Sequence, residues 1–473
     1  MAIASKKETN RLLSLIKEGR PMTLGQQLYL AVQLSLPSIM AQLSSIAMQY
    51  IDASMVGSLG ARASASIGLV STTTWLFMGL SSATAAGFSV QVAHLLGARD
   101  EMQARNVLRQ GLVAALFVSL VLASAGCAIS GALPRWLGGG EDINSDASAY
   151  FFIFIASLPA LQMNMLASGM LRSSGNMYVP SMLNVLMCVL DVVFNTFLIF
   201  PTAHYDVLGV GITLPGAGLG VTGAALGTAL AAAVTALLML YFLCFRSPEL
   251  HLWGRPGSFR PTADCLRKAL RIGVPMGVER IAMCGAQIAS TVIVAPLGTV
   301  AIAANAFGIT TESLCYMPGY GVADAATTLI GQSMGAGRRD LMRRFAHITV
   351  LMGVGVMTVM GVLMYVGAPW VIGLMTPDAD VLRLAVEVLR IEAFAEPLYA
   401  ASIVCYGVFV GAGDTLGPCL MNLVSMWVVR LSLAAHLAPV MGLRGVWTAM
   451  CAELCFRGII FLARLRWGRW GRR

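Results

Sequence analysis

Twelve segments of this chain are each long and apolar enough to cross a lipid bilayer as a helix. A membrane-spanning helix needs about 20 mostly apolar residues, and such segments recur along most of the 473 residues. Their approximate limits are 29–58, 65–95, 107–133, 148–170, 178–201, 216–245, 268–296, 300–333, 346–374, 381–410, 416–440 and 442–466. The sequence therefore predicts an all-α polytopic membrane protein with twelve transmembrane helices.

The composition excludes several classes of function. Hydrophobic residues make up 57% of the chain and charged residues only 12%, whereas a soluble domain carries about 25% charged residues. A soluble enzyme, a disordered chain and a nucleic-acid-binding protein are therefore excluded. No lysine closes a G-x-x-x-x-G-K phosphate loop, and the ten cysteines form no C-x-x-C pair. We expect no ATPase activity in the chain itself, no zinc or disulfide framework and no cofactor.

The placement of lysine and arginine predicts the orientation. When the loops are assigned to alternate sides, most of the 32 basic residues fall on the side of both termini. The other side holds Arg62, Arg135, Arg383, Arg390 and Arg444. Cytoplasmic loops carry the excess of basic residues. We expect a multi-pass protein of the plasma (inner) membrane, with both termini in the cytoplasm and a basic, partly amphipathic N-terminal segment along the inner surface.

The second half of the chain repeats the first. An offset of 238 residues, without a gap, brings glycine, proline and asparagine positions into register. The matched positions are Pro37 with Pro275, Leu59-Gly60 with Leu297-Gly298, Gly97 with Gly335, Pro159 with Pro397, Gly175 with Gly413, Pro180 with Pro418, and Asn184 with Asn422. Because each half has six spans, both run in the same direction. The halves are predicted to be parallel repeats that form two six-helix bundles.

The repeat and the polar segments suggest the domain organisation. We predict a cytoplasmic amphipathic segment at 1–28, a first six-helix bundle at 29–245, a cytoplasmic linker at 246–267, a second bundle at 268–466 and a basic cytoplasmic tail at 467–473. The segment at about 202–217 has no counterpart in the second half. We expect it to be an extracellular hairpin or loop.

Two repeated motifs and one motif of the second half carry a resemblance to a known family. The turn HLLGAR at 94–99 matches QSMGAG at 332–337, and SSGN at 173–176 matches GAGD at 411–414. The second half also contains ESLCYMPGYG at 312–321. In these motifs and over about residues 25–465 the chain resembles the multidrug and toxic compound extrusion (MATE) family. The resemblance implies export of small organic cations or amphipathic molecules in exchange for protons or sodium ions, by alternating access between the two bundles.

Carboxylates inside the predicted spans are the candidate coupling groups, because a charge at bilayer depth is costly and is usually functional or paired. Asp52 lies in the first span with no basic residue one turn away. Asp191 lies in the fifth span, and Asn184, Asp191 and Asn195 recur on one helix face. We interpret Asn184 and Asn195 as polar cavity residues. The resemblance implies that Asp52 and Asp191 couple transport to a proton or another cation.

Further acidic residues lie in spans of the second half. Glu279, Glu312 and Glu396 are possible coupling residues there, although Glu279 could equally be structural beside Arg280. Asp324 has no assigned role. Glu453 and Arg457 are four residues apart, which is the spacing of a helical ion pair, and we expect them to be structural. The partners expected are small-molecule substrates and membrane lipids, with the protein acting as a monomer.

Two other functions remain open at this stage. A lipid-linked oligosaccharide flippase of the same superfamily would need a basic cavity for pyrophosphate, and the intramembrane bases are few. A more remote alternative is an intramembrane aspartyl protease, since Gly411-Ala-Gly413-Asp414 matches G-x-G-D and Asp191 could supply the second acid. The motif is short, and Asp414 falls at a turn before Pro418, where it has a simpler role in turn formation.

Overall fold

Helices make up nearly all of the computed structural model, which describes residues 2–207, 210–468 and 470–471. The first half contains α1 (Ala2–Lys17), α2 (Leu24–Gly57), α3 (Ala61–Gly97), α4 (Glu101–Ile129), α5 (Leu133–Trp136), α6 (Glu141–Ala156), α7 (Leu158–Ser173), α8 (Tyr178–Ile199) and α9 (Gly220–Tyr241). The second half contains α10 (Ala263–Val294), α11 (Thr299–Gly335), α12 (Arg339–Met375), α13 (Ala379–Glu392), α14 (Glu396–Gly411), α15 (Leu416–Val424), α16 (Leu431–Met441) and α17 (Leu443–Trp467). Short π-helical turns, Phe242–Arg246 and Ser425–Arg430, follow α9 and join α15 to α16.

The predicted fold class is confirmed. In the described part of the chain, nine helical spans and two bent helix pairs are long and apolar enough to cross a membrane. The twelfth span is α11, because the repeat offset of 238 takes both ends of α3, Ala61 and Gly97, to the ends of α11. Several helices begin earlier than hydropathy predicts, since polar caps extend them. Thr23, for example, closes a capping box with Gln26 at the start of α2.

Two spans are broken at the prolines that the sequence places inside them. The axes of α6 and α7 differ by 44° at Ser157, next to Pro159, and those of α13 and α14 differ by 60° just before Pro397. Proline removes a backbone donor and clashes with the preceding turn, so it ends or bends a helix. The spans predicted at 148–170 and 381–410 are therefore each two helices meeting at an angle.

The segment without a counterpart in the second half forms an antiparallel hairpin, as predicted. Its strands are β1 (Pro201–Val207) and β2 (Val210–Ala217), with Val207 paired to Val210 and Pro201 to Ala217. The tip at 208–209 lies outside the described residues.

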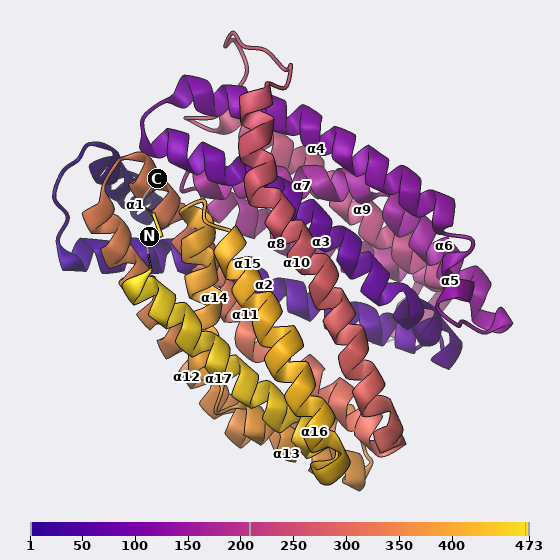
Figure 1. The fold of residues 1–473 in the computed structure, drawn as a ribbon. Coiled ribbons are helices and arrows are strands. Elements are labelled where there is room, and N and C mark those ends of the chain that lie inside the picture. The colour runs from indigo at the N-terminus through magenta and orange to yellow at the C-terminus, as the bar shows by residue number, and fades with distance from the viewer. Residues whose placement is uncertain (1, 208–209, 469, 472–473) are drawn as a thin grey trace.

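The two halves form two lobes that contact each other through equivalent helices. Helix α2 of the first lobe packs on α11 of the second lobe. Helix α10 of the second lobe packs on α3 of the first lobe. The repeat offset relates these two contacts to each other. Both termini lie at one end of the bundle (Figure 1), which we call the basic end because it carries Lys17, Arg20 and Arg338.

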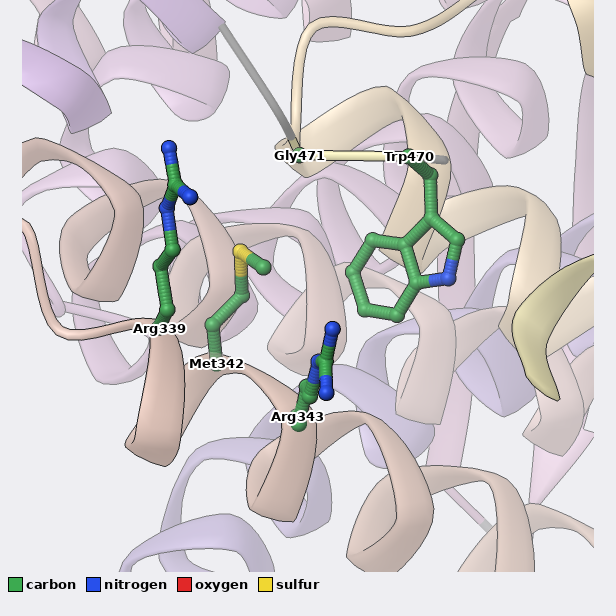
Figure 2. Close-up of a pocket in the computed structure, with 5 residues that line it drawn as sticks. All are labelled: Arg339, Met342, Arg343, Trp470 and Gly471. Atoms are coloured by element: carbon green, nitrogen blue, oxygen red, sulfur yellow. The ribbon is translucent and has the colours of Figure 1, made fainter. Parts of the chain in front are cut away.

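The chain's C-terminal residues return to the second lobe at the basic end. Trp470 and Gly471 lie across from Arg339, Met342 and Arg343 on the first turns of α12 (Figure 2). The indole Nε1 of Trp470 donates to the carbonyl of Leu465, 2.8 Å away. Arg469, Arg472 and Arg473 of the predicted tail lie outside the described residues.

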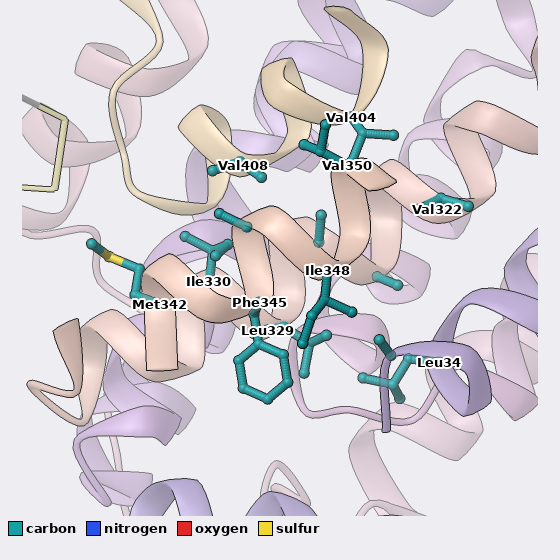
Figure 3. Packing of buried hydrophobic residues seen from close by; sticks show 14 of the residues in the cluster. Leu34, Val322, Leu329, Ile330, Met342, Phe345, Ile348, Val350, Val404 and Val408 are labelled. Atoms are coloured by element: carbon teal, nitrogen blue, oxygen red, sulfur yellow. The ribbon is translucent and has the colours of Figure 1, made fainter. Parts of the chain in front are cut away.

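The largest apolar core joins both lobes at the basic end. It is built mainly from α11, α12 and α14, and Figure 3 shows Leu34 of α2 near the same cluster. The amphipathic helix α1 adds Leu12, Leu13 and Ile16, which are at most 2% exposed. The N-terminal segment was predicted to lie along the membrane surface. In the described residues its apolar face is covered by protein, since α1 packs on α2, α3 and α11, and its place relative to the membrane stays a prediction.

Candidate functional site

The two predicted coupling aspartates are brought together by one asparagine. The amide Nδ2 of Asn195 lies 2.9 Å from Oδ1 of Asp52 and 3.2 Å from Oδ2 of Asp191. Asp191 and Asn195 are fully buried, and Asp52 is partly buried. We call these three residues the first-lobe cluster.

Helix spacing and a close helix contact position the first-lobe cluster. Asp191 and Asn195 are four residues apart on α8, so they share a face, and α8 packs on both α2 and α9. Gly227 of α9 makes room for the amide, because a Cβ atom there would collide with Oδ1 of Asn195. Asn184, predicted on the same face, makes no hydrogen bond to the first-lobe cluster within the described residues.

The first-lobe cluster has spare hydrogen-bonding capacity. Oδ1 of Asp191 and Oδ1 of Asn195 are buried without a partner among the described residues. Buried polar atoms are normally satisfied, so an unsatisfied pair calls for an explanation such as a proton or ion that comes and goes. A proton on one of the two carboxyl groups would supply a donor that the first-lobe cluster lacks.

A second group of acids lies in the second lobe, at the break between α13 and α14. Glu392 is the last residue of α13, Glu396 is the first of α14, and Glu312 comes from α11. The charges of these three carboxylates act on one another. Both carboxylate oxygens of Glu392 and of Glu396 are buried without a partner in the described part of the chain. We call Glu312, Glu392 and Glu396 the second-lobe cluster.

The two clusters are not copies of each other. The repeat offset takes Asp52 to Ser290 and Asp191 to Val429. In the opposite direction it takes the three glutamates of the second-lobe cluster to Thr74, Phe154 and Leu158. The repeat therefore supplies a common scaffold, and each lobe places its own acids on different helices of that scaffold.

The predicted ion pair between Glu453 and Arg457 is confirmed and is part of a larger network. Arg457 lies 2.6 Å from one carboxylate oxygen of Glu453, and Arg430 lies 3.1 Å from the other. Ser425 also donates to the Glu453 carboxylate. Because Glu453 is fully buried and paired twice, its contacts are those of a structural residue that holds α17 to the turn between α15 and α16.

We expect replacement of Arg457 by methionine to destabilise the protein. Glu453 would keep its charge but only one of its two arginine partners, so we expect a loss of about 1–3 kcal/mol, below the about 3–5 kcal/mol of a buried charge left without any partner. The measurement is the thermal unfolding of the purified protein in detergent. Arg383→Met is the control, since Arg383 is exposed and its pair with Glu387 is long, at 3.8 Å. Equal stability of the two variants would contradict the structural role.

Glu279, predicted as a possible coupling residue or a partner of Arg280, has other contacts. Its carboxylate accepts hydrogen bonds from Tyr406 at 2.7 Å, from Asn422 at 2.6 Å and from the thiol of Cys419 at 2.8 Å. No ion pair between Glu279 and Arg280 is formed within the described residues. These contacts tie α10 to α14 and α15 rather than to the second-lobe cluster.

Asp324, to which the sequence assigned no role, joins the two lobes. Its carboxylate lies 2.6 Å from Arg172 at the end of α7 and 3.0 Å from the hydroxyl of Ser38 on α2. Thr328, one turn further along α11, donates to the carbonyl of Arg172 at 3.1 Å. The first lobe is therefore held to α11 by an ion pair and by neutral hydrogen bonds.

The repeated turn motifs form a symmetric contact beside this ion pair. His94 Nε2 lies 2.7 Å from the carbonyl of Gly411, and Gln332 Nε2 donates to the carbonyl of Ser173 at 2.8 Å. The repeat offset converts one of these bonds into the other. A Cβ atom on Gly97 or Gly335 would collide with the backbone of the opposite lobe. We call these contacts, together with the Arg172–Asp324 pair, the basic-end contact.

Asp414 has the position and partner expected of a turn residue. It lies between α14 and α15 and forms an ion pair of 2.5 Å with Arg464. Within the described residues, no group of three or more histidine, cysteine or acidic side chains is arranged to hold a metal ion. Asp414 is paired with Arg464 and Asp191 with Asn195, so the two aspartates of the G-x-G-D reading make no contact with each other within the described residues.

Sequence reasoning missed two features of the candidate site. Glu392 is one of the candidate intramembrane carboxylates of the sequence, but its grouping with Glu312 and Glu396 was not predicted, although two glutamates four residues apart before Pro397 are a usable signal for acids at a helix break. The pairing of Arg172 with Asp324 had no such signal, because 152 residues separate them. Only the packing of α7 against α11 brings the two side chains together.

Comparison with known proteins gives the same division of the chain. The MatE family model matches twice, over residues 37–197 and 275–435, and the two matches are related by the offset found in the sequence. The proteins named "Probable multidrug resistance protein NorM" from Thermotoga maritima and Brucella suis are similar. The first is 24% identical over 93% of each chain, and the second is 28% identical over 94% of this chain and 93% of the relative.

Solved structures share the fold. A crystal structure of MATE in complex with MaL6 has a TM-score of 0.85 at 22% identity and covers 93% of this chain and 96% of its own. A multidrug resistance MATE family transporter in an outward-facing conformation has a TM-score of 0.82 at 21% identity, covering 93% and 95%. Because the family model matches both halves, the chain belongs to the MATE family and is a transporter rather than an enzyme.

Proposed function

We propose that the chain is a secondary active antiporter, which exports cationic or amphipathic drugs in exchange for protons or, as the alternative, sodium ions. The observation that carries this proposal is the first-lobe cluster, in which Asn195 bridges Asp52 and Asp191. Two acids that share one amide inside the membrane form a site where a proton and a cationic substrate can compete. The names of the NorM relatives support drugs as the substrates.

The proposed transport cycle moves one lobe against the other. We assign the basic end to the cytoplasm, because loops rich in lysine and arginine are retained there. In this conformation the basic-end contact joins the lobes, while their other ends lie apart (Figure 1). Protons from outside would then neutralise the first-lobe cluster and release the drug outward. Separation of the basic-end contact would return the empty site to the cytoplasm for deprotonation.

The ion that drives transport can be identified in everted membrane vesicles from an efflux-deficient host. We expect accumulation of a fluorescent cationic dye to stop when a protonophore collapses the proton gradient. Accumulation should continue when sodium is absent from both sides. Continued accumulation after the collapse, together with its loss on removal of sodium, would replace the proton by sodium in the proposal.

We assign the second-lobe cluster an accessory coupling role. Glu396 stands at the head of α14, and its carboxylate has no partner among the described residues. Glu279 is a weaker candidate because three hydrogen bonds already satisfy it. The second lobe would then add a second exchangeable proton to the cycle.

The accessory role predicts a graded effect of mutation. We expect Glu396→Gln to lower the initial rate of dye efflux several-fold without abolishing it, because the first-lobe cluster still exchanges its proton. The measurement is efflux in cells with matched expression, and Asp380→Asn, which changes an exposed acid in the first turn of α13, is the control. Efflux at the rate of the unmodified protein would remove the second-lobe cluster from the mechanism.

The flippase alternative gains no support from the charges of this chain. A lipid pyrophosphate would need several unpaired bases within the membrane. Both Arg430 and Arg457 are occupied by Glu453, which leaves Arg280 as the one intramembrane base without an ion pair in the described part of the chain.

A further inference from the structure

Two adjoining cavities at the basic end lie outside both acidic clusters. The first has a volume of about 380 Å³ and is lined by Arg339, Met342, Arg343, Trp470 and Gly471 (Figure 2). The second has a volume of about 450 Å³ and shares Trp470 and Gly471 with the first. Its lining is polar on one side, at Arg271, Asp414 and Thr415, and apolar on the other, at Leu270, Val274, Pro275, Met334 and Leu416. We call the pair the Trp470 cavities.

The first cavity is positively charged. Arg339 and Arg343 are one turn apart at the start of α12, and both are exposed. Neither forms an ion pair with a described carboxylate. The nearest acid in sequence, Asp340, is paired with Arg338 at 3.0 Å, and that guanidinium holds the pKa of the Asp340 carboxyl below its usual value. The positive end of the α12 dipole adds to the same potential.

The second cavity adjoins surfaces that face lipid. Exposed apolar residues run along α10 at Leu270, Val274, Val278 and Ile281, all more than half exposed, and along α15 at Leu416, Leu420 and Val424, also more than half exposed. In helices of a membrane-spanning bundle, such rows face the acyl chains. Leu270 and Leu416, which begin the two rows, both line the second cavity. It therefore lies where the apolar surface of the bundle begins.

The guanidiniums lie where lipid headgroups are expected. On α12 the exposed apolar surface begins at Leu351, which is 71% exposed and two turns beyond Arg343. Trp470 lies between the basic cavity and the second cavity with its apolar side at Leu270 and Leu416, and tryptophan is enriched at this boundary of membrane proteins. A ligand that fills both cavities must therefore carry a negative group next to an apolar chain.

We propose that the Trp470 cavities bind one anionic phospholipid from the leaflet at the basic end. Its phosphate is held between Arg339 and Arg343, and its glycerol and upper acyl chain lie past Trp470 against Leu270 and Leu416. Basic pockets at this depth recognise anionic headgroups through charge-assisted hydrogen bonds. A lipid bound there joins α10, α12 and the C-terminal residues, and so stabilises the basic end of the second lobe.

The test compares two neighbouring arginines of α12. Purified protein in a neutral detergent is titrated with phosphatidylglycerol, with phosphatidylcholine and, separately, with inorganic phosphate, and lipid binding is followed by native mass spectrometry and by the shift in melting temperature. The variants are Arg343→Gln, which changes the cavity, and Arg344→Gln, which removes an equal charge from an exposed residue that does not line it.

We expect phosphatidylglycerol to bind to the unmodified protein and to Arg344→Gln with similar affinity. Binding to Arg343→Gln should be about fivefold weaker, since a basic residue near an anionic surface contributes about 1 kcal/mol. Phosphatidylcholine and inorganic phosphate should leave the melting temperature unchanged.

Equal weakening of phosphatidylglycerol binding by both substitutions would mean that the lipid is held by general attraction between charges and not at this site. A response to inorganic phosphate equal to that of the lipid would show an anion site without an acyl-chain contact. Either result would overturn the proposal.

Discussion

Cells that produce the Asp52→Asn variant should be as sensitive to cationic drugs as cells with the empty vector. The substitution keeps the size of the side chain and its ability to accept the hydrogen bond from Asn195, which spans 2.9 Å in the unmodified protein. It removes the negative charge that a cationic substrate and a proton would compete for. The measurement is the minimal inhibitory concentration, together with the amount of variant protein in the membrane fraction.

Asp146→Asn is the matched control for this prediction. Asp146 is an exposed aspartate near the start of α6 and forms no ion pair within the described residues. It should leave resistance unchanged. Full resistance in Asp52→Asn, at equal expression, would remove the first-lobe cluster from the coupling mechanism.

Asp324→Asn should open the basic end more often than in the unmodified protein. The substitution removes the charge that faces Arg172 across the lobe interface at 2.6 Å and leaves Arg172 without an acid. The pair is only partly buried, so we expect the closed state to lose about 1–2 kcal/mol. Since 1.4 kcal/mol is a tenfold change, the open population should rise about tenfold.

The reporter for this opening is a cysteine in place of Ser173, whose carbonyl accepts the hydrogen bond from Gln332. In a background without the native cysteines, a polar maleimide should label this position about tenfold faster when Asp324 is replaced. The exchange of both charges, Arg172→Asp with Asp324→Arg, should restore part of the transport that either single change impairs. Asp340→Asn is the control. Unchanged labelling in Asp324→Asn would mean that the ion pair does not hold the lobes together.

The sequence predicts the scaffold well because its signals are local and repeated. Length and apolarity predict the spans, and the offset that relates Pro37 to Pro275 also relates the family matches and the lobe contacts. Pro159 and Pro397 coincide with the two bent spans, whereas Pro37 and Pro275 lie inside continuous helices, so proline alone does not predict where a span bends. The hairpin was predictable because it interrupts the repeat.

The candidate site was only partly predictable. Asp52 and Asp191 stand out in the sequence because they are isolated acids in apolar spans, and the structure brings them together through Asn195. Asn184 shares a face of α8 with Asp191 and yet makes no hydrogen bond to the first-lobe cluster within the described residues, since a shared face does not fix which neighbouring helix each residue meets. The partners of Glu279 and Asp324 come from distant helices, so only tertiary packing determines them.

The most direct test of the central claim is the affinity of the purified protein for a cationic dye, measured as a function of pH. Acidification protonates the first-lobe cluster, so the dissociation constant of the unmodified protein should rise as the pH falls. In Asp52→Asn the affinity should be low at every pH, with most of this dependence lost. Affinity of the unmodified protein that does not change with pH, or an unaltered pH dependence in Asp52→Asn, would contradict the account.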